Sequence, residues 1–282
     1  ASLKMFGHQM LIPIPDIERT DYLLILGANP GASNGSLLTA PGFSQKIKNI
    51  QKRGGEVINI DPRYTETSKI SSNHFFINPG KDALLLLSLL HVIFEQGINE
   101  KTHLSNHLKG LNEIKEIVKK YPPQKTASII GINGFEIQKI AKDFMNSETA
   151  VCYGRMGVST QEFGGICQWL INVINIVTNN MDKAGGAMFT EAAIDLVFMT
   201  GMQGKVGNFD RYRSRVHDLP EYSGELPVAT LADEMIVEGE GQIKMLICTA
   251  GNPVLSTPNG KKLEKALEGL DFMVSIDIYL NE

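Results

Sequence analysis

The chain has 282 residues, enough for one large domain or two of ordinary size, and 43% of them are hydrophobic. Its 27 basic and 31 acidic residues give a formal net charge of −4. Binding to nucleic acid or to an anionic membrane needs a clustered cationic surface, so this near balance favours neither partner.

Cysteine usage and hydropathy indicate the setting of the protein. Cys152, Cys167 and Cys248 are odd in number and far apart, so we expect buried core thiols in a reducing compartment. The longest apolar run, residues 83–94, is too short to span a membrane, and no signal peptide is recognisable. We therefore expect a cytoplasmic location. Because the sequence starts without a methionine and stops just after a strand-like run, we also expect an excised segment.

The first elements along the chain predict a parallel sheet. Residues 21–27, DYLLILG, are a continuous apolar run typical of a strand buried on both faces. A loop rich in Gly, Asn, Pro and Ser follows, and then an amphipathic helix with Ser44 as its N-cap. A second strand at 56–60 and a third within 74–80 precede an apolar helix that begins near Asp82. This alternation predicts βαβ units.

The same alternation continues through the middle of the chain. We expect helices around 111–121 and 134–144, the second capped by Asn133, then a strand running into a glycine turn over 149–157. A long apolar helix at 166–180 follows.

The pattern changes near the end of the chain. From about Glu191 to Gly241 the alternation is lost, with at most one short helix near Thr230–Ile236. A new strand, helix and strand then follow. We predict a Rossmann-like parallel sheet flanked by helices, with part of a second related α/β domain. The predicted boundaries are an α/β domain at 1–195, connecting loops at 196–240 and the partial second domain at 241–282.

The glycine-rich loop GANPGASNG, residues 27–35, has three interpretations. It fits a nucleophile elbow with Ser33, but Pro30 intervenes and the predicted helix starts only at Ser44, which disfavours an esterase. Its glycines are spaced four apart, unlike G-x-G-x-x-G, which disfavours a nicotinamide dehydrogenase. Backbone N–H groups with Asn29, Ser33 and Asn34 can instead meet a phosphate or nucleoside, unless the loop is only a turn.

Two more loops follow predicted strands. Asp61 either accepts hydrogen bonds from a ribose or base or caps its own turn, and Arg63 can face a phosphate. Gly80, Lys81 and Asp82 begin a helix, where Asp82 is alternatively only an N-cap. Loops after parallel strands lie along one edge of the sheet, where such folds bind ligands. We therefore expect the three loops to form one site.

The search for metal ligands gives no site. His103 and His107 have the i,i+4 spacing of a zinc pair on a helix, but no third ligand is evident, so an exposed polar face is the better interpretation. Trp169 has apolar residues at helical spacing and is expected in the core.

Taken together, these motifs are similar to those of a known family. The chain resembles the molybdopterin oxidoreductases of the dimethyl sulfoxide reductase family in five stretches, LLILGANPGASN, INIDPRYTETSKISSNHFFINPGKDALLLLSLLHVIFEQG, YGRMGVSTQEFG, NNMDKAGGAMFT and AGNPVLSTPNG. The resemblance covers the chain from about Asp21 to Glu282. It implies that two molybdopterin guanine dinucleotides hold one molybdenum through dithiolene sulfurs, and that two related α/β domains each bind one dinucleotide.

The resemblance also implies which residues bind the cofactor. Those for the first dinucleotide are Gly27, Ala28, Asn29, Pro30, Ser33, Asp61, Pro62, Arg63, Gly80, Lys81 and Asp82. Those that approach the pterin are Met156, Gly157 and Thr160. Those that end the equivalent loops for the second dinucleotide are Asn252 and Asp277.

The implied function is that of a cofactor-binding segment of a molybdenum oxidoreductase. Such an enzyme converts a small substrate and passes electrons to an external carrier, here an electron-transfer subunit. The molybdenum ligand and a 4Fe–4S cluster are expected outside the segment, so we name no catalytic residue and expect the isolated segment to be inactive. Formate dehydrogenases of the family have an arginine near the metal, where this chain reads GGAMFTEAAID with Glu191, which argues against formate.

One alternative is a non-catalytic relative that keeps the fold as a structural or electron-transfer subunit, as in respiratory complex I. The retained polar residues Asn29, Asp61 and Arg63 argue against it, because a scaffold without a dinucleotide does not need them.

Overall fold

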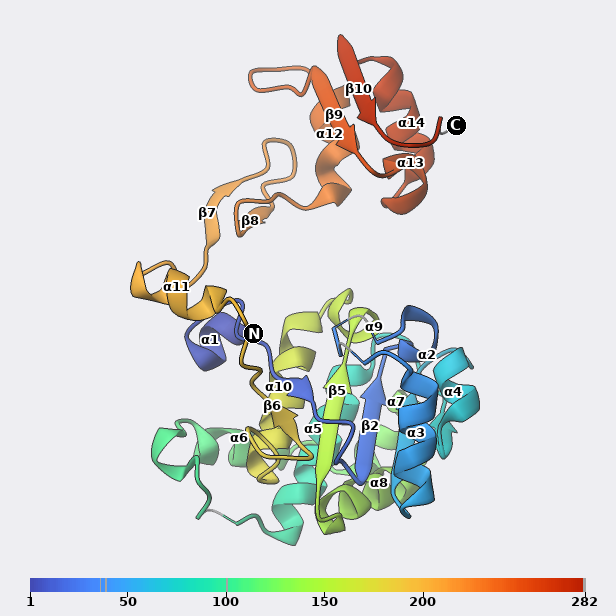
Figure 1. Cartoon of the computed structure of the whole chain (residues 1–282), viewed down its shortest axis with the longest axis vertical. Coiled ribbons are helices and arrows are strands. Elements are labelled where there is room, and N and C mark those ends of the chain that lie inside the picture. Colours follow the sequence, from blue (N-terminus) through green and yellow to red (C-terminus); the bar gives the residue numbers. More distant parts are fainter. Residues whose placement is uncertain (36, 39, 100, 281–282) are drawn as a thin grey trace. The chain divides into compact units, whose positions relative to one another are not determined.

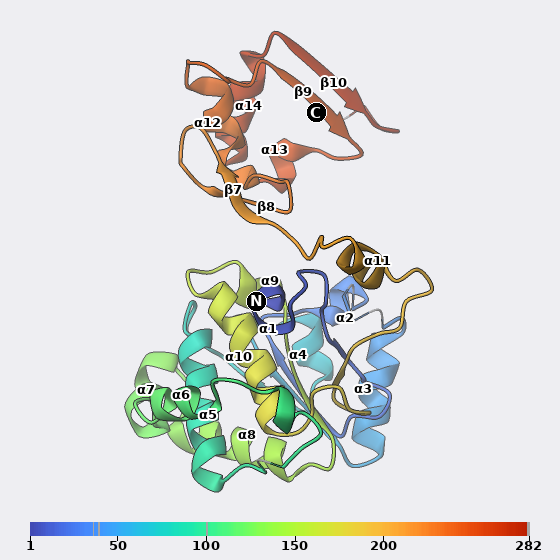
Figure 2. The same cartoon turned by 90° about the vertical axis from the view of Figure 1, so that its left-hand side faces the viewer.

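The computed structural model describes residues 1–35, 37–38, 40–99 and 101–280. The chain divides into two compact units, Ala1–Gly204 and Lys205–Glu282, which we call unit 1 and unit 2. Both contain parallel strands connected by helices (Figures 1 and 2), so the predicted α/β class is confirmed.

A four-stranded parallel sheet forms the centre of unit 1. Its strand order is β4-β3-β2-β5, with β2 at Tyr22–Leu26, β3 at Glu56–Ile60, β4 at Asn73–Phe75 and β5 at Ala150–Gly154. All five residues of β2 are buried, because β2 is paired on both edges and its side chains alternate between two apolar layers. Figure 1 shows β2 and β5 side by side.

Helices cover both faces of this sheet. Leu24 and Leu26 point into a core formed with α5, α7, α8 and α10, whereas Leu23 and Ile25 point into a second core with α3. The helices between Asn29 and Val177 are α2 (Pro30–Ser33), α3 (Phe43–Lys52), α4 (Glu66–Ile70), α5 (Asp82–Gln96), η1 (Ser105–His107), α6 (Leu111–Val118), α7 (Pro123–Ile130), α8 (Gly134–Asn146), α9 (Met156–Ser159) and α10 (Gly164–Val177).

The ends of unit 1 are tied to one another. The antiparallel pair β1 (Ile14–Pro15) and β6 (Ala187–Met188) joins the start of the unit to the segment after α10. The short helices α1 (Ser2–Phe6) and α11 (Leu196–Met202) lie outside the sheet.

One predicted helix start and one alternative N-cap need correction, whereas the start of α5 near Asp82 and the cap of α8 are confirmed. Helix α3 begins at Phe43 with Gly42 as its N-cap, not Ser44, because Gly42 adopts a left-handed conformation (φ 68°) that starts the helix earlier. In α5 the N-cap is Lys81, and Asp82 is the first helical residue. Asn133 caps α8 by accepting a hydrogen bond from the Phe135 backbone N–H, as expected.

Unit 2 contains a parallel pair of strands with two helices after the first of them. The strands are β9 (Met245–Thr249) and β10 (Phe272–Ile276), and the helices are α13 (Pro253–Ser256) and α14 (Gly260–Glu268). Its small core includes Leu263 and Ala266 of α14 and Met235 of α12 (Leu231–Ile236).

The segment predicted as connecting loops contains more structure than expected. Besides η2 (Val228–Thr230) and α12, it holds α11 and the antiparallel hairpin of β7 (Phe209–Arg213) and β8 (Pro220–Tyr222). The hairpin has no buried apolar alternation. A fully buried Glu221 instead accepts a hydrogen bond from the Arg211 guanidinium at 2.8 Å. Hydrophobic periodicity therefore could not reveal it.

Candidate functional site

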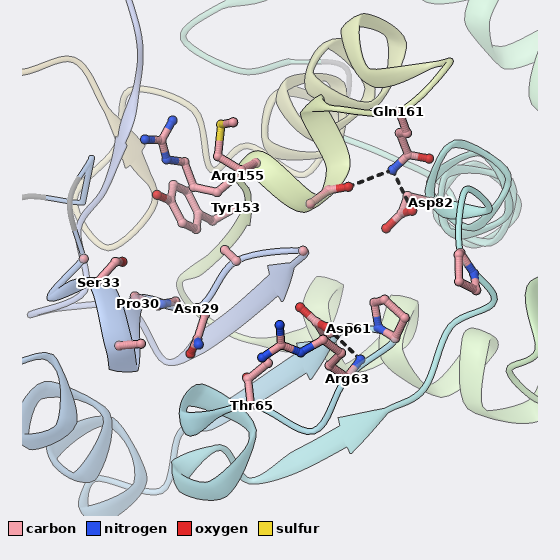
Figure 3. Close-up of a pocket in the computed structure, with 18 of the residues that line it drawn as sticks. Asn29, Pro30, Ser33, Asp61, Arg63, Thr65, Asp82, Tyr153, Arg155 and Gln161 are labelled. Atoms are coloured by element: carbon pink, nitrogen blue, oxygen red, sulfur yellow. Dashed lines mark hydrogen bonds between the residues drawn. The ribbon is translucent and has the colours of Figure 1, made fainter. Parts of the chain in front are cut away.

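The carboxyl ends of β2, β3 and β5 surround a cavity of about 610 Å³ in unit 1. Figure 3 shows its lining, with side chains from the three loops that follow these strands. The chain leaves β2 toward β3 on one side and returns to β5 on the other side. A crevice at such a switch of strand order is where open α/β sheets bind ligands.

Two glycines form the floor of the cavity where the β2 and β5 loops touch. The Gly157 N–H donates to the Gly27 carbonyl oxygen at 2.8 Å. A Cβ on Gly27 would lie 2.7 Å from the backbone nitrogen of Val158, and Gly27 also has a φ of +52°. A Cβ on Gly157 would lie 2.7 Å from the Gly27 Cα. Both positions therefore require glycine, because a Cβ on either residue would collide with the backbone of the other loop.

The Asn29 side chain fixes the first loop to α4. Its Oδ1 accepts hydrogen bonds from the backbone N–H and the hydroxyl of Thr67, at 3.1 and 2.9 Å, and its Nδ2 donates to Glu66 at 2.8 Å. The Gly31 N–H also donates to the Thr67 hydroxyl, at 2.9 Å. Asn29 thus lines the cavity while its polar groups are occupied by α4.

The second loop presents Asp61 and Arg63. Asp61 Oδ1 accepts a hydrogen bond from the Arg63 backbone N–H at 2.8 Å, which closes the turn across Pro62. This leaves the guanidinium of Arg63 exposed beside the cavity. Among the described residues it has no ion-pair partner within 4 Å, so it is available to an anion.

Asp82 is the buried carboxyl group of the site. Asp82 is the first residue of α5 and is 5% exposed. Its Oδ2 accepts a hydrogen bond from Gln161 Nε2 at 2.8 Å. Burial raises the pKa of Asp82, and the hydrogen bond from Gln161 opposes that shift. Gln161 also donates to the Gly157 carbonyl oxygen at 3.2 Å (Figure 3). The loop between β4 and α5 is thereby connected to the loop after β5.

Most of the residues expected at the site lie together. The cavity is lined by twelve of them: Gly27, Ala28, Asn29, Pro30, Ser33, Asp61, Pro62, Arg63, Gly80, Asp82, Met156 and Gly157. Lys81 and Thr160 do not line it. The Thr160 hydroxyl donates back to the Met156 carbonyl oxygen at 2.7 Å.

Several lining residues were missed from the sequence. Tyr153 and Arg155 line the cavity from the end of β5, beside each other in Figure 3, and Thr65 and Gln161 complete the wall. Burial raises the pKa of Tyr153 to about 12, and the nearby Arg155 charge lowers it in part. Arg155 has no ion-pair partner within 4 Å in the part of the chain that the structure describes. The signal for Tyr153 and Arg155 was their place at the end of a buried strand.

A second cavity, of about 410 Å³, lies within unit 2. Asn252 and Asp277 line it, as do Pro253 and Cys248. Cys152 and Cys167 are buried as predicted, but Cys248 is only partly buried, because β9 has a single neighbouring strand among the described residues.

Other chemistries find less support. No group of three or more His, Cys, Asp or Glu side chains within the described ranges could hold a metal ion. His107 lies in the 3₁₀ turn η1, so His103 and His107 do not share an α-helix. Ser33 is the last residue of the short helix α2, whereas a nucleophile elbow places its serine between strand and helix. No helix of the described residues is long and apolar enough to cross a membrane.

Comparisons with known proteins give the family of the chain. The family model described as molybdopterin oxidoreductase matches residues 2–282. The chain is 31% identical to the F420-dependent formate dehydrogenase subunit alpha of Methanocaldococcus jannaschii, over 95% of this chain and 40% of that protein. It is 26% identical to the nitrate reductase of a Synechocystis species, over 94% of this chain and 38% of that protein.

A solved structure shares the fold. Acetylene hydratase from Pelobacter acetylenicus superposes with a TM-score of 0.75 at 21% identity, covering 98% of this chain and 41% of that one.

The chain therefore belongs to the molybdopterin oxidoreductase family, which implies molybdenum and a molybdopterin cofactor. It spans about 40% of the length of the first curated relatives that it matches.

Proposed function

We propose that the carboxyl-edge cavity of unit 1 binds the guanine dinucleotide form of molybdopterin. The observation that carries this proposal is that one cavity is lined by Arg63 of the β3 loop, by Arg155 of the β5 loop and by the buried carboxyl group of Asp82, and that neither arginine has an ion-pair partner within 4 Å among the described residues. A dinucleotide has a diphosphate for such guanidinium groups and a base and ribose for carboxyl groups. The residues present therefore fit the group.

Each wall of the cavity has a distinct role in this proposal. Arg63 and Arg155 would neutralise the phosphates through their guanidinium groups. Asp82 has one oxygen held by Gln161; the other would accept hydrogen bonds from the N–H groups of guanine. When bound, the cofactor supplies the redox chemistry at its metal, and the chain binds and orients it.

We propose that unit 2 provides the equivalent loop ends for a second dinucleotide. Asn252 follows β9 as Asn29 follows β2, and Asp277 follows β10 as Asp61 follows β3. The repeated order of strand, short helix, helix and strand supports this assignment.

The whole protein is proposed to be an oxidoreductase for a small substrate. Curated relatives are named formate dehydrogenase and nitrate reductase, so membership of the family does not select one substrate. Glu191 also stands where formate dehydrogenases are expected to have an arginine. The name "subunit alpha" makes that relative part of a multi-subunit enzyme, which supports an electron-transfer subunit as a partner here, with a 4Fe–4S cluster outside this segment.

The first test is the molybdenum and guanine content of the full-length protein, purified without oxygen. We expect about one molybdenum and two guanines per chain on the resemblance to the family. Arg63→Gln removes an exposed cation without a protein partner, so it should lower guanine retention without altering folding. Lys120→Gln, which removes an exposed cation outside the cavity, is the matched control.

A folded protein with neither molybdenum nor guanine would contradict the proposal. That result would favour the non-catalytic relative, and the next step would be to identify its partner subunits.

A further inference from the structure

The carboxylate of Asp82 lies in the proposed cofactor cavity without a positive charge beside it. No lysine, arginine or histidine of the described residues has a nitrogen within 4 Å of its oxygens. The titratable groups near it are Asp61 of the β3 loop and Cys167 of α10, and Lys81 precedes it with an exposed side chain. Burial and the charge of Asp61 both raise the pKa of Asp82. Its ionised form therefore depends on the hydrogen bonds that it accepts.

Gln161 donates one of these hydrogen bonds from a fixed position. Its Nε2 donates to Asp82 Oδ2 at 2.8 Å and to the Gly157 carbonyl oxygen at 3.2 Å. A carbonyl oxygen and an ionised carboxylate only accept hydrogen bonds, so turning the amide over would place Gln161 Oε1 against two acceptors. The backbone of Gln161 is also fixed, because its carbonyl oxygen accepts from the Gly164 N–H at 2.9 Å. These contacts select one orientation of the side chain.

The same contacts connect Asp82 to the floor of the cavity. Gly157, the second acceptor, donates its own N–H to the Gly27 carbonyl oxygen at 2.8 Å. Gln161 therefore bridges the first residue of α5 and the place where the β2 and β5 loops touch, and Figure 3 shows its two hydrogen bonds. Because Gln161 bonds to Oδ2, the position of Asp82 Oδ1 relative to this floor is also defined.

We propose that Gln161 is a positioning residue for guanine, which directs the Asp82 carboxylate and preserves its ionised form so that Oδ1 accepts N–H groups of the base. This role rests on the proposed function, in which Asp82 binds guanine. A protonated carboxyl group would instead present an O–H donor to the N–H donors of guanine. A neutral amide favours the ionised form and leaves its charge to the base, whereas an ion pair with a lysine or arginine would neutralise that charge.

The test is calorimetric titration with GDP of the full-length protein, produced in a host that makes no molybdopterin. The titration is repeated between about pH 8 and about pH 4. Binding should weaken as the pH falls through the pKa of Asp82, because guanine binds its ionised form. The phosphate groups of GDP also titrate in this range, so the loss assigned to Asp82 is the part that Asp82→Asn removes.

Two substitutions of Gln161 test its role. Gln161→Met should weaken GDP binding at neutral pH by about tenfold, because the direction of the Asp82 carboxylate is no longer fixed. It should also move the acid loss of binding to higher pH, because it removes a hydrogen bond that lowers the pKa of Asp82. Gln161→Glu keeps the length of the side chain but cannot donate while it is ionised, so it should move the acid loss in the same direction.

Gln168→Met is the matched control. Gln168 Nε2 also donates to two acceptors, the Gly154 carbonyl oxygen at 3.1 Å and the Ser159 hydroxyl at 2.9 Å, but Gln168 does not line the cavity. This variant should leave the affinity for GDP and its pH dependence unchanged.

The outcomes separate the role of Gln161 from the proposed function. If the unaltered protein does not bind GDP, guanine binding at Asp82 and the role of Gln161 both fail. If it binds GDP but the Gln161 variants keep its pH dependence, the role of Gln161 alone is overturned, even where their affinity is uniformly lower. A uniform loss of that kind would mean that Gln161 only connects the two loops.

Discussion

The first strand and loop of unit 1 have a close counterpart in unit 2, and the two differ in what surrounds them. In unit 1 the Gly27 N–H donates to the Ile60 carbonyl oxygen at 3.0 Å; in unit 2 the Ala250 N–H donates to the Ile276 carbonyl oxygen at 2.9 Å. The φ angles are also nearly equal, +52° at Gly27 and +51° at Ala250. The same left-handed position is thus filled by glycine in one unit and alanine in the other.

The difference between glycine and alanine at this position comes from β5, the second neighbour of β2 in the sheet. In unit 1, β5 pairs with β2 and brings Gly157 and Val158 against Gly27, so a Cβ has no room. In unit 2, β9 pairs only with β10 among the described residues, and its residues are partly exposed. Local sequence therefore sets the turn, while the neighbouring strand decides which residue it tolerates.

The largest expected effect tests the burial of the two strands. Leu24→Ala in β2 should lower the free energy of unfolding of unit 1 by about 3–4 kcal/mol, because the Leu24 side chain is fully buried under the helices that cover this face of the sheet. Leu246→Ala in the partly exposed β9 should cost about 1 kcal/mol or less. Hydrogen exchange read separately in each unit measures both. Equal losses would show that β9 is as enclosed as β2.

The next effect concerns the left-handed position. Gly27→Ala should destabilise unit 1 by about 2–3 kcal/mol, since backbone strain and the contact with Val158 add. Ala250→Gly should instead stabilise unit 2 by up to about 1 kcal/mol by relieving strain alone. Thermal unfolding of the two variants checks the opposite signs. A harmless Gly27→Ala would mean that the Gly157 loop moves away at no cost.

A smaller effect separates the two asparagines. Asn29→Ala should cost about 1–2 kcal/mol, because it removes three hydrogen bonds to α4. Asn252→Ala should cost about 0.5–1 kcal/mol, because that side chain accepts from the Leu255 N–H and caps α13. Chemical denaturation of both variants gives the difference. A larger loss at Asn252 would reverse the comparison.

The smallest expected effects are the opposite pH dependences of stability that the buried carboxyl groups of Asp82 and Glu221 give to the two units. Burial raises the pKa of Asp82 above 3.8, so the stability of unit 1 should rise as the pH falls through that raised pKa, because the folded state takes up the proton first. Arg211 lowers the pKa of Glu221 to about 2. The contribution of the Glu221 carboxylate to the stability of unit 2 is complete above pH 4.5 and is lost as the pH falls toward 2.

Hydrogen exchange between about pH 6 and about pH 3 should therefore show slopes of opposite sign in the two units. Asp82→Asn and Glu221→Gln should each remove the slope of its own unit. Unchanged slopes in these variants would assign the pH dependence to other groups.

Much of the fold was predictable because its signals are local. The continuous apolar run of β2, the Asn133 cap and the turn at Asp61 each depend on residues within a few positions of one another. The start of α3 was misassigned, since Gly42 and Ser44 both offer plausible starts and only the backbone conformation selects Gly42. The β7–β8 hairpin was missed because the ion pair of Glu221 and Arg211, not an apolar face, holds it.

The sequence by itself determined which segments become the parallel strands, where their glycine and asparagine loops fall, and that two such segments repeat. Only the tertiary structure decided what those loops enclose. Tyr153, Arg155 and Gln161 reach the loop of residues 27–35 because β5 pairs with β2 across more than a hundred residues of chain. Strand pairing over that distance is chosen by the packing of both sheet faces, which no local pattern encodes. The same pairing makes Gly27 and Gly157 irreplaceable, whereas the equivalent turn in unit 2 accepts an alanine.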